Sequence, residues 1–254
     1  MTSEPVRPEP LLDRSRAATV LIGVVMAAAA GSLWADLAQL DLLNRVADGA
    51  RIGLAEAQDA DDRVATMALI YTVASILSAI TFLLWYSRAY RNIAALGVSR
   101  PRWGRGWAVG YWFIPIANLF RPKQVMNDIW RGSDPRLSVN TANLQNLPVN
   151  PLLHWWWAAW LLSGWISNFA IRRAFDDQAP TIDNLQAQAT GYVVTDVADL
   201  VVGVLAILVI RSITARQEER RRLYEEGAIR GQVPTTADAD PGTAQAGPST
   251  PANP

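Results

Sequence analysis

Residues 191–210 read GYVVTDVADLVVGVLAILVI, a run of twenty residues in which only Asp196 and Asp199 are charged. A bilayer core of roughly 30 Å requires about 20 apolar residues in a helix, so this run predicts a membrane-spanning segment. Three further runs of the same kind lie at 17–34, 64–86 and 152–171. The expected fold class is therefore all-α, a polytopic membrane helical bundle with four transmembrane helices.

A fifth apolar run, 107–120, is interrupted by Pro115. A helix over its 14 residues reaches only about 21 Å, so we expect an interfacial or re-entrant segment instead of a span. With four spans, eighteen Lys and Arg residues lie on the side of both termini and five on the other side. A fifth span would leave ten of these residues on the side of the amino terminus and thirteen on the opposite side. Because basic loops stay on the cytoplasmic side, both termini are predicted to be cytoplasmic.

The two ends of the chain differ in composition from the membrane domain expected over 17–226. The Pro-rich segment 1–16 predicts a disordered lead, and the Pro-, Thr- and Ala-rich segment 227–254 predicts a disordered tail. The last helix is expected to continue past the fourth span and to stop at Gly227. A cleavable signal peptide is the alternative interpretation of the first run, and the acidic residues before that run argue against it.

The composition argues against several functional classes. Equal numbers of basic and acidic residues, 23 of each, argue against nucleic-acid binding. The absence of Cys and the single His154 leave no thiolate or His-based metal site, and no cofactor is expected. Ser163 lies about 13 Å along the helix from His154, beyond proton transfer, and Asp196 and Asp199 on one helix do not face each other as an aspartyl pair does. We therefore predict a protein that is not an enzyme.

The predicted cytoplasmic block, 87–150, interleaves Trp with basic residues. A basic, Trp-rich segment suits an anionic membrane surface or a protein partner, although a simple in-plane anchor fits the same pattern. A short helix from Pro122 places Val125, Met126, Ile129 and Trp130 on one face, which we expect to lie along the membrane surface. The candidate surface residues are Arg88, Arg91, Trp107, Trp112, Pro115, Asn118, Lys123, Gln124, Asp128 and Trp130.

This block also carries a set of recognisable strings. They are WYSRAYRN at 85–92, GWAVG at 106–110, WFIPIANL at 112–119, PKQV at 122–125, DIW at 128–130 and ITARQ at 213–217. With these strings the chain resembles the bacterial membrane proteins grouped as domain of unknown function 4328, over roughly residues 64–220. The resemblance implies a multi-span helical protein of the bacterial plasma membrane with no assigned activity, substrate or cofactor.

Asp196 and Asp199 are the carboxylates within a predicted span, about 7 and 12 Å below the outer surface. Ionisable residues at membrane depth are functional candidates by default. The candidate polar cluster joins them with Tyr71, Thr72 and Asn168, which lie at similar depth on other spans. The structural interpretation is that these carboxylates form an interhelical clasp, holding helices together by hydrogen bonds, or are hydrated from the outer surface. The functional interpretation is a proton-linked or cation-binding cavity.

Two functions follow from these features. The first is an interaction or accessory component that uses the basic, Trp-rich block at the membrane surface. The alternative is a small transporter, channel or sensor subunit with an outer-leaflet polar cavity around Asp196 and Asp199. Expected partners are the bilayer with its anionic lipids, a partner protein or a second copy of the chain, since small residues in the spans permit close helix packing.

Overall fold

The computed structural model describes residues 7–97, 101–137, 144–174 and 181–227, and within these ranges the regular elements are helices, as predicted. Four helices are long: α1 (Leu12–Ala47), α2 (Leu54–Ala95), α6 (Pro151–Ala174) and α7 (Ile182–Glu225). The short elements between α2 and α6 are α3 (Arg105–Gly110), η1 (Tyr111–Phe113), α4 (Pro115–Asn118), α5 (Arg121–Gly132) and η2 (Leu144–Asn146).

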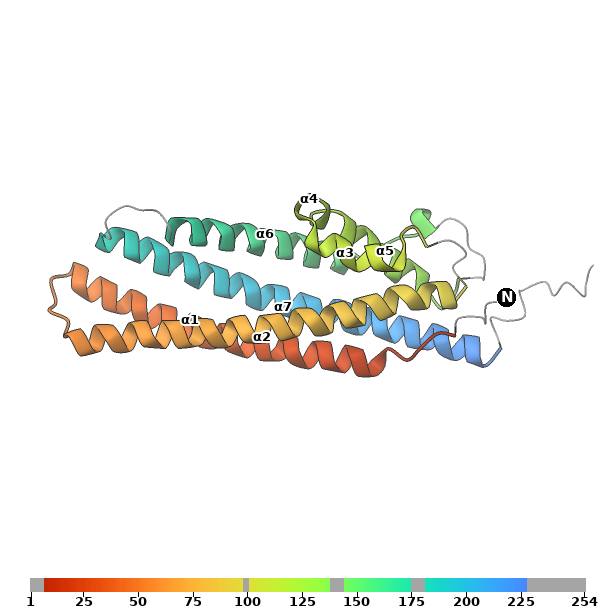
Figure 1. Ribbon diagram of the computed structural model, residues 1–254, viewed down its shortest axis with the longest axis horizontal. Coiled ribbons are helices and arrows are strands. Elements are labelled where there is room, and N and C mark those ends of the chain that lie inside the picture. Colours follow the sequence, from red (N-terminus) through yellow and green to blue (C-terminus); the bar gives the residue numbers. More distant parts are fainter. Residues whose placement is uncertain (1–6, 98–100, 138–143, 175–180, 228–254) are drawn as a thin grey trace, which may run out of the picture.

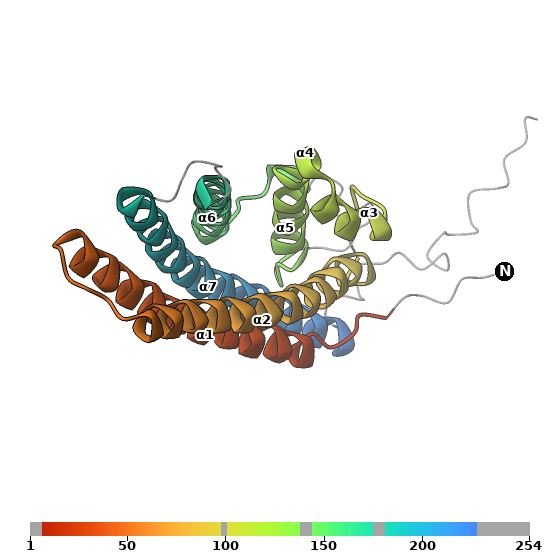
Figure 2. The ribbon, with the colours of Figure 1, turned by 60° about the vertical axis from the view of Figure 1, so that its left-hand side comes forward.

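The long helices pack side by side along the longest dimension of the molecule (Figure 1). Helix α1 packs along both α2 and α7, and α7 packs in turn along α6, which gives the order α2, α1, α7, α6. The short helices α3, α4 and α5 gather near the end of the bundle where α1 begins and α7 ends, and they lie on the same side as α6 (Figure 2). The predicted cytoplasmic block is therefore folded onto the bundle.

Helices α1, α2 and α7 are long and apolar enough to cross a membrane. The predicted span 152–171 lies in α6, which is not among these three. Helix α6 contains five Trp residues together with His154 and Asn168, and these side chains lower its hydropathy although indole rings favour the membrane interface. The three helices are compatible with a multi-pass membrane protein, and the count of four spans stays a prediction.

Helix α7 continues well beyond the predicted span 191–210. Its 44 residues correspond to about 66 Å, roughly twice the thickness of a bilayer core. The helix ends at Glu225, and Gly227 adopts φ +80°, a left-handed conformation that favours glycine. The predicted extension of the last helix to this glycine is confirmed.

The amino-terminal segment is ordered from residue 7, so the disordered lead predicted over 1–16 is wrong for most of its length. Leu11 is fully buried, and its backbone N–H donates to the carboxylate of Glu218 on α7. The side chain of Asn92 on α2 exchanges hydrogen bonds of 2.7 and 3.1 Å with the backbone of Glu9. Composition does not reveal such contacts with distant helices. The predicted disordered tail lies outside the described residues from 228 onward.

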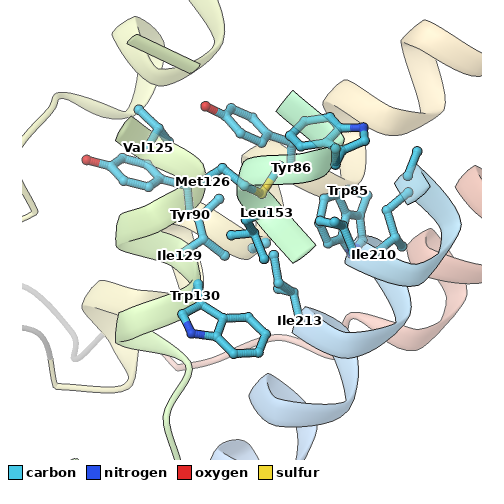
Figure 3. Close-up of a cluster of buried hydrophobic side chains, with 14 of the residues drawn as sticks. Trp85, Tyr86, Tyr90, Val125, Met126, Ile129, Trp130, Leu153, Ile210 and Ile213 are labelled. Atoms are coloured by element: carbon cyan, nitrogen blue, oxygen red, sulfur yellow. The ribbon is translucent and has the colours of Figure 1, made fainter. Parts of the chain in front are cut away.

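The main hydrophobic core lies where α5 meets α2, α6 and α7 (Figure 3). Val125, Met126 and Ile129 of α5 are fully buried in it, against Tyr86 of α2 and Leu153 of α6. The expectation that this face of α5 lies along the membrane surface is therefore wrong, because protein covers it. An amphipathic pattern identifies the apolar face of a helix but does not say what covers that face.

The apolar run 107–120 is divided into α3, η1 and α4. Pro115 begins α4, a position where its missing N–H costs no hydrogen bond. Large side chains on this segment are exposed, including Trp107 at 58% and Ile116 at 78%. The run does not form one spanning helix, in agreement with its length.

Candidate functional site

Asp199 on α7 connects three helices. Its Oδ2 accepts a hydrogen bond of 2.5 Å from Oη of Tyr71 on α2, and its Oδ1 accepts one from Oγ of Ser163 on α6. A carboxylate is purely an acceptor, so one donor on each oxygen suits the ionised form. The structure thus places the predicted cluster member Tyr71 on Asp199 in an interhelical clasp.

Asp196, one turn before Asp199, faces α1. Asp196 and Asp36 line the same cavity, and the two residues are only 8% and 7% exposed. Two carboxyl groups buried in one cavity repel each other when both are ionised. Oδ2 of Asp196 has no hydrogen-bond partner among the described residues.

These three carboxyl groups line one chamber of about 400 Å³ between α1, α2, α6 and α7, which we call the carboxylate chamber. Tyr71 and Tyr192 also line it. None of the described side chains that line the chamber is basic. Its wall therefore supplies negative charge and no cation to neutralise it.

Two predicted members of the cluster do not bond to the aspartates. Oγ1 of Thr72 donates to the carbonyl of Ala68 at 2.7 Å and lines the chamber. Nδ2 of Asn168 donates to the carbonyl of Gly164 at 2.9 Å and lines the neighbouring cavity. Both side chains are satisfied within their own helix, so they add polarity near the site without holding it together.

A smaller cavity of about 270 Å³ adjoins the carboxylate chamber. The two share Asp36, Val64 and Tyr192, and the smaller one also contains Asp61 and Gln188. Its lining comes from the ends of the long helices that lie away from α5. This smaller cavity lies between the chamber and the far end of the bundle.

Trp112 and Trp130, both predicted surface residues, belong to packed aromatic groups. The ring of Trp112 meets the rings of Phe82 and Trp160 edge-on, with centroids 5.4 and 5.5 Å apart. Trp130 is buried, and the guanidinium of Arg216 lies over its ring at 4.2 Å from the centroid. Both rings pack within the bundle, and Trp112 also lines a cavity between the long helices.

The charged residues of α5 are enclosed as well. Asp128 is buried between Arg102 and Arg131, at 3.7 and 3.9 Å, and burial raises its pKa while the two arginines oppose that rise. Nζ of Lys123 donates to Oδ1 of Asn127 at 2.5 Å. Burial, with the nearby charge of Arg131, lowers the pKa of Lys123 to about 8.

The remaining candidate surface residues are dispersed. Arg88 forms an ion pair with Glu9, Arg91 is partly buried on α2, and Gln124 accepts a hydrogen bond from Arg121 at 3.1 Å. Trp107 and Pro115 are exposed, whereas Asn118 points to a cavity between the long helices. The structure therefore does not bring the ten predicted residues into one surface.

A family model matches residues 48–215, more than half of the chain. The chain belongs to the family described as Domain of unknown function (DUF4328). The resemblance noted in the sequence is thereby confirmed. In this DUF4328 protein the matched region contains Tyr71, Ser163, Asp196 and Asp199, whereas Asp36 precedes it. No curated protein and no solved structure matches the chain.

Sequence reasoning missed two site residues of the DUF4328 protein, Asp36 and Ser163. The first apolar run ends at residue 34, which leaves Asp36 outside the predicted span, yet α1 continues to Ala47. The available signal was the spacing of Ala29, Ser32 and Asp36, which places small and polar residues on one helix face. The spacing from His154 excludes Ser163 as a nucleophile but does not reveal that its hydroxyl donates to Asp199.

Proposed function

We propose that this DUF4328 protein is a small transporter, channel or sensor subunit that binds a small organic cation in the carboxylate chamber. The observation that carries the proposal is Asp196, which is 8% exposed while its Oδ2 lacks a partner among the described residues. A buried carboxylate without a cation costs several kcal/mol. A cation in the chamber offsets that cost, since no basic side chain lines it among the described residues.

The size and lining of the chamber favour an organic cation. Its volume of about 400 Å³ exceeds the space that a single bare metal ion fills. Within the described residues, no three acidic or His side chains come together as metal ligands. Tyr71 and Tyr192 present rings, whose faces attract an ammonium group.

The proposal includes a placement in the bacterial plasma membrane with α6 as the fourth span. Support comes from the exposed apolar residues along α6, which are Trp155, Leu162, Trp165 and Phe169. The excess of Lys and Arg on the side of both termini favours cytoplasmic ends. In this orientation the chamber lies in the outer half of the bilayer, and the smaller cavity with Asp61 leads outward.

An interaction or accessory role is the second candidate function, with a contact surface that differs from the predicted one. The specific support is an exposed apolar edge on the segment from α3 to α4, formed by Trp107, Phe113, Ile116 and Phe120. Arg102, which is exposed before α3 and also pairs with Asp128, adds a basic residue to this segment, which suits anionic lipid. Native mass spectra of the protein from its own membrane test this role. Retained anionic lipid or a second polypeptide supports the role, and the absence of both contradicts it.

Equilibrium binding of radiolabelled tetramethylammonium to the full chain in nanodiscs of zwitterionic lipid tests the cation site. We expect one saturable site per chain, with affinity reduced about tenfold or more by Asp196→Asn. Asp183→Asn is the matched control, because Asp183 is exposed in the first turn of the same helix. Absence of saturable binding, or equal affinity in the wild type and Asp196→Asn, contradicts the proposal.

A further inference from the structure

Two cavities of about 560 and 390 Å³ beside the carboxylate chamber together form one groove, which we call the apolar groove. Both are lined by Ile22 of α1, Ser78 of α2, Asn118 of α4, Trp160 of α6 and Ala206 of α7. Helices α1 and α7 contribute one wall, and α2 and α6 contribute the flanks. Trp112 and Phe113 line the part nearest η1 and α4.

The apolar groove begins where the carboxylate chamber ends. Tyr71 and Asp199 line both the chamber and the larger cavity of the groove, so the hydrogen bond between them lies at the junction. From Asp199 to Ala206, α7 advances about 10 Å along the groove. A negatively charged site therefore stands at one end of an elongated space.

The wall of the groove is mainly hydrocarbon and aromatic. Phe82, Leu83 and Trp156 line it away from Asp199. The residues Ala79, Phe113 and Trp165 line it as well and are exposed on the surface of the bundle. The groove thus opens at the side of the bundle, which faces lipid in the proposed membrane placement.

We infer that the ligand is a single-chain cationic amphiphile, with its ammonium head in the carboxylate chamber and its alkyl tail in the apolar groove. This inference rests on the proposed function and names its ligand class. Charge complementarity selects the head, because Asp199 and the Asp36–Asp196 pair attract a cation and repel a phosphate or carboxylate head. The side opening lets the tail enter from the outer leaflet without crossing water.

A substitution that blocks the groove and leaves the chamber unchanged separates the contribution of the tail to binding from that of the head. Val202 lines both cavities of the groove and not the chamber, so Val202→Phe fills the tail space. Val201→Phe is the matched control, because the neighbouring Val201 is 51% exposed. Ala79→Phe on α2 blocks the groove from its rim and serves as the second variant if Val202→Phe does not fold.

The binding of butyl-, octyl- and dodecyltrimethylammonium is measured by competition against radiolabelled tetramethylammonium in zwitterionic nanodiscs. The bilayer also takes up alkyl tails, so each probe is compared between variants and not with other probes. We expect octyltrimethylammonium to bind about tenfold more weakly to Val202→Phe than to the wild type or Val201→Phe. Tetramethylammonium, which has no tail, is expected to bind equally to all three.

The outcomes distinguish this inference from the proposed function. If tetramethylammonium binds but octyltrimethylammonium binds equally to the wild type and to both groove variants, the tail site is wrong and the cation site stands. If no ammonium probe binds saturably, both are wrong. Competition by octyl sulfate as strong as by octyltrimethylammonium overturns the selection of a cationic head.

A photoreactive probe locates the tail directly. The probe is octyltrimethylammonium with a diazirine at the end of its tail, and labelled peptides are identified by mass spectrometry. We expect labels near Trp112 and Trp156, and their loss in Val202→Phe. Labels confined to Val73 and Ile80, which are exposed on α2, place the tail in bulk lipid and overturn the inference.

Discussion

Oη of Tyr71 and Oδ2 of Asp199 are 2.5 Å apart, although the two residues are separated by 128 positions in the sequence. Ser163 donates to the other oxygen of the same carboxylate, so one side chain of α7 joins α2 and α6. Hydrogen bonds to charged acceptors are stronger than neutral ones. The clasp therefore stabilises the bundle at the place where the carboxylate chamber and the apolar groove meet.

Tyr71→Phe removes one of the two donors to Asp199 and keeps the ring. We expect the free energy of unfolding to fall by about 1 kcal/mol, because interhelical hydrogen bonds in membranes contribute about that much. Thr72→Val is the control, since the Thr72 hydroxyl bonds within its own helix. Denaturant unfolding in detergent measures both variants, and equal losses of stability contradict a specific role for the clasp.

Arg220 on α7 is fully buried and donates to backbone carbonyls from three places, Leu96, Asp134 and Leu137. Arg220→Met leaves these carbonyls without their donor, and we expect a loss of about 3 kcal/mol in the free energy of unfolding. Arg222→Met is the control. Arg222 is exposed and pairs with Glu219 at the surface, so its loss should cost much less stability than the loss of Arg220. Similar losses in the two variants contradict this assignment.

Gly203 of α7 packs tightly against α1. A Cβ at this position would lie 2.6 Å from Cγ of Met26, so Gly203→Ala forces the helices or Met26 to move. We expect a loss of about 1–3 kcal/mol in unfolding free energy. Gly164 of α6 has no atom within 4 Å of such a Cβ, and Gly164→Ala should be neutral or stabilise by about 0.5–1 kcal/mol. Thermal unfolding compares the two, and a stabilising Gly203→Ala contradicts the close contact.

Asp134 contributes a pH-dependent stability. Burial acts to raise its pKa, but hydrogen bonds from Arg136 and the charges of Arg216 and Arg136 outweigh burial and lower the pKa from 3.8 to about 2. The folded state therefore binds this proton more weakly than the unfolded state. The stabilisation is fully present above about pH 4 and is lost as the pH falls toward 2.

Thermal unfolding of the wild type and Asp134→Asn between pH 2 and neutrality checks this effect. We expect the difference in Tm to be constant above about pH 4 and to shrink as the pH approaches 2. A difference that does not change with pH shows that Asp134 acts without its charge. Asp183→Asn, at an exposed position of α7, controls for a general effect of removing a carboxylate.

The apolar runs predicted the long helices, and the candidate polar cluster grouped Tyr71 with Asp199, which the structure joins. Hydropathy did not reveal that Asp36 belongs to the site. An apolar run ends where carboxylates begin, whereas α1 continues through them. Hydropathy also did not reveal that Lys123 and Trp130 are buried. The amphipathic pattern of α5 is the same whether lipid or protein covers its apolar face, and only the contacts with α2 and α6 decide between them.

The central claim is that a cation meets the carboxyl groups of Asp36 and Asp196. Infrared difference spectroscopy of the protein in zwitterionic nanodiscs, with and without tetramethylammonium, observes carboxyl groups directly. We predict that binding changes the carboxyl bands, that Asp196→Asn abolishes the change, and that Asp183→Asn retains it. A spectrum without a carboxyl change on binding, or the same change in Asp196→Asn as in the wild type, would contradict the account.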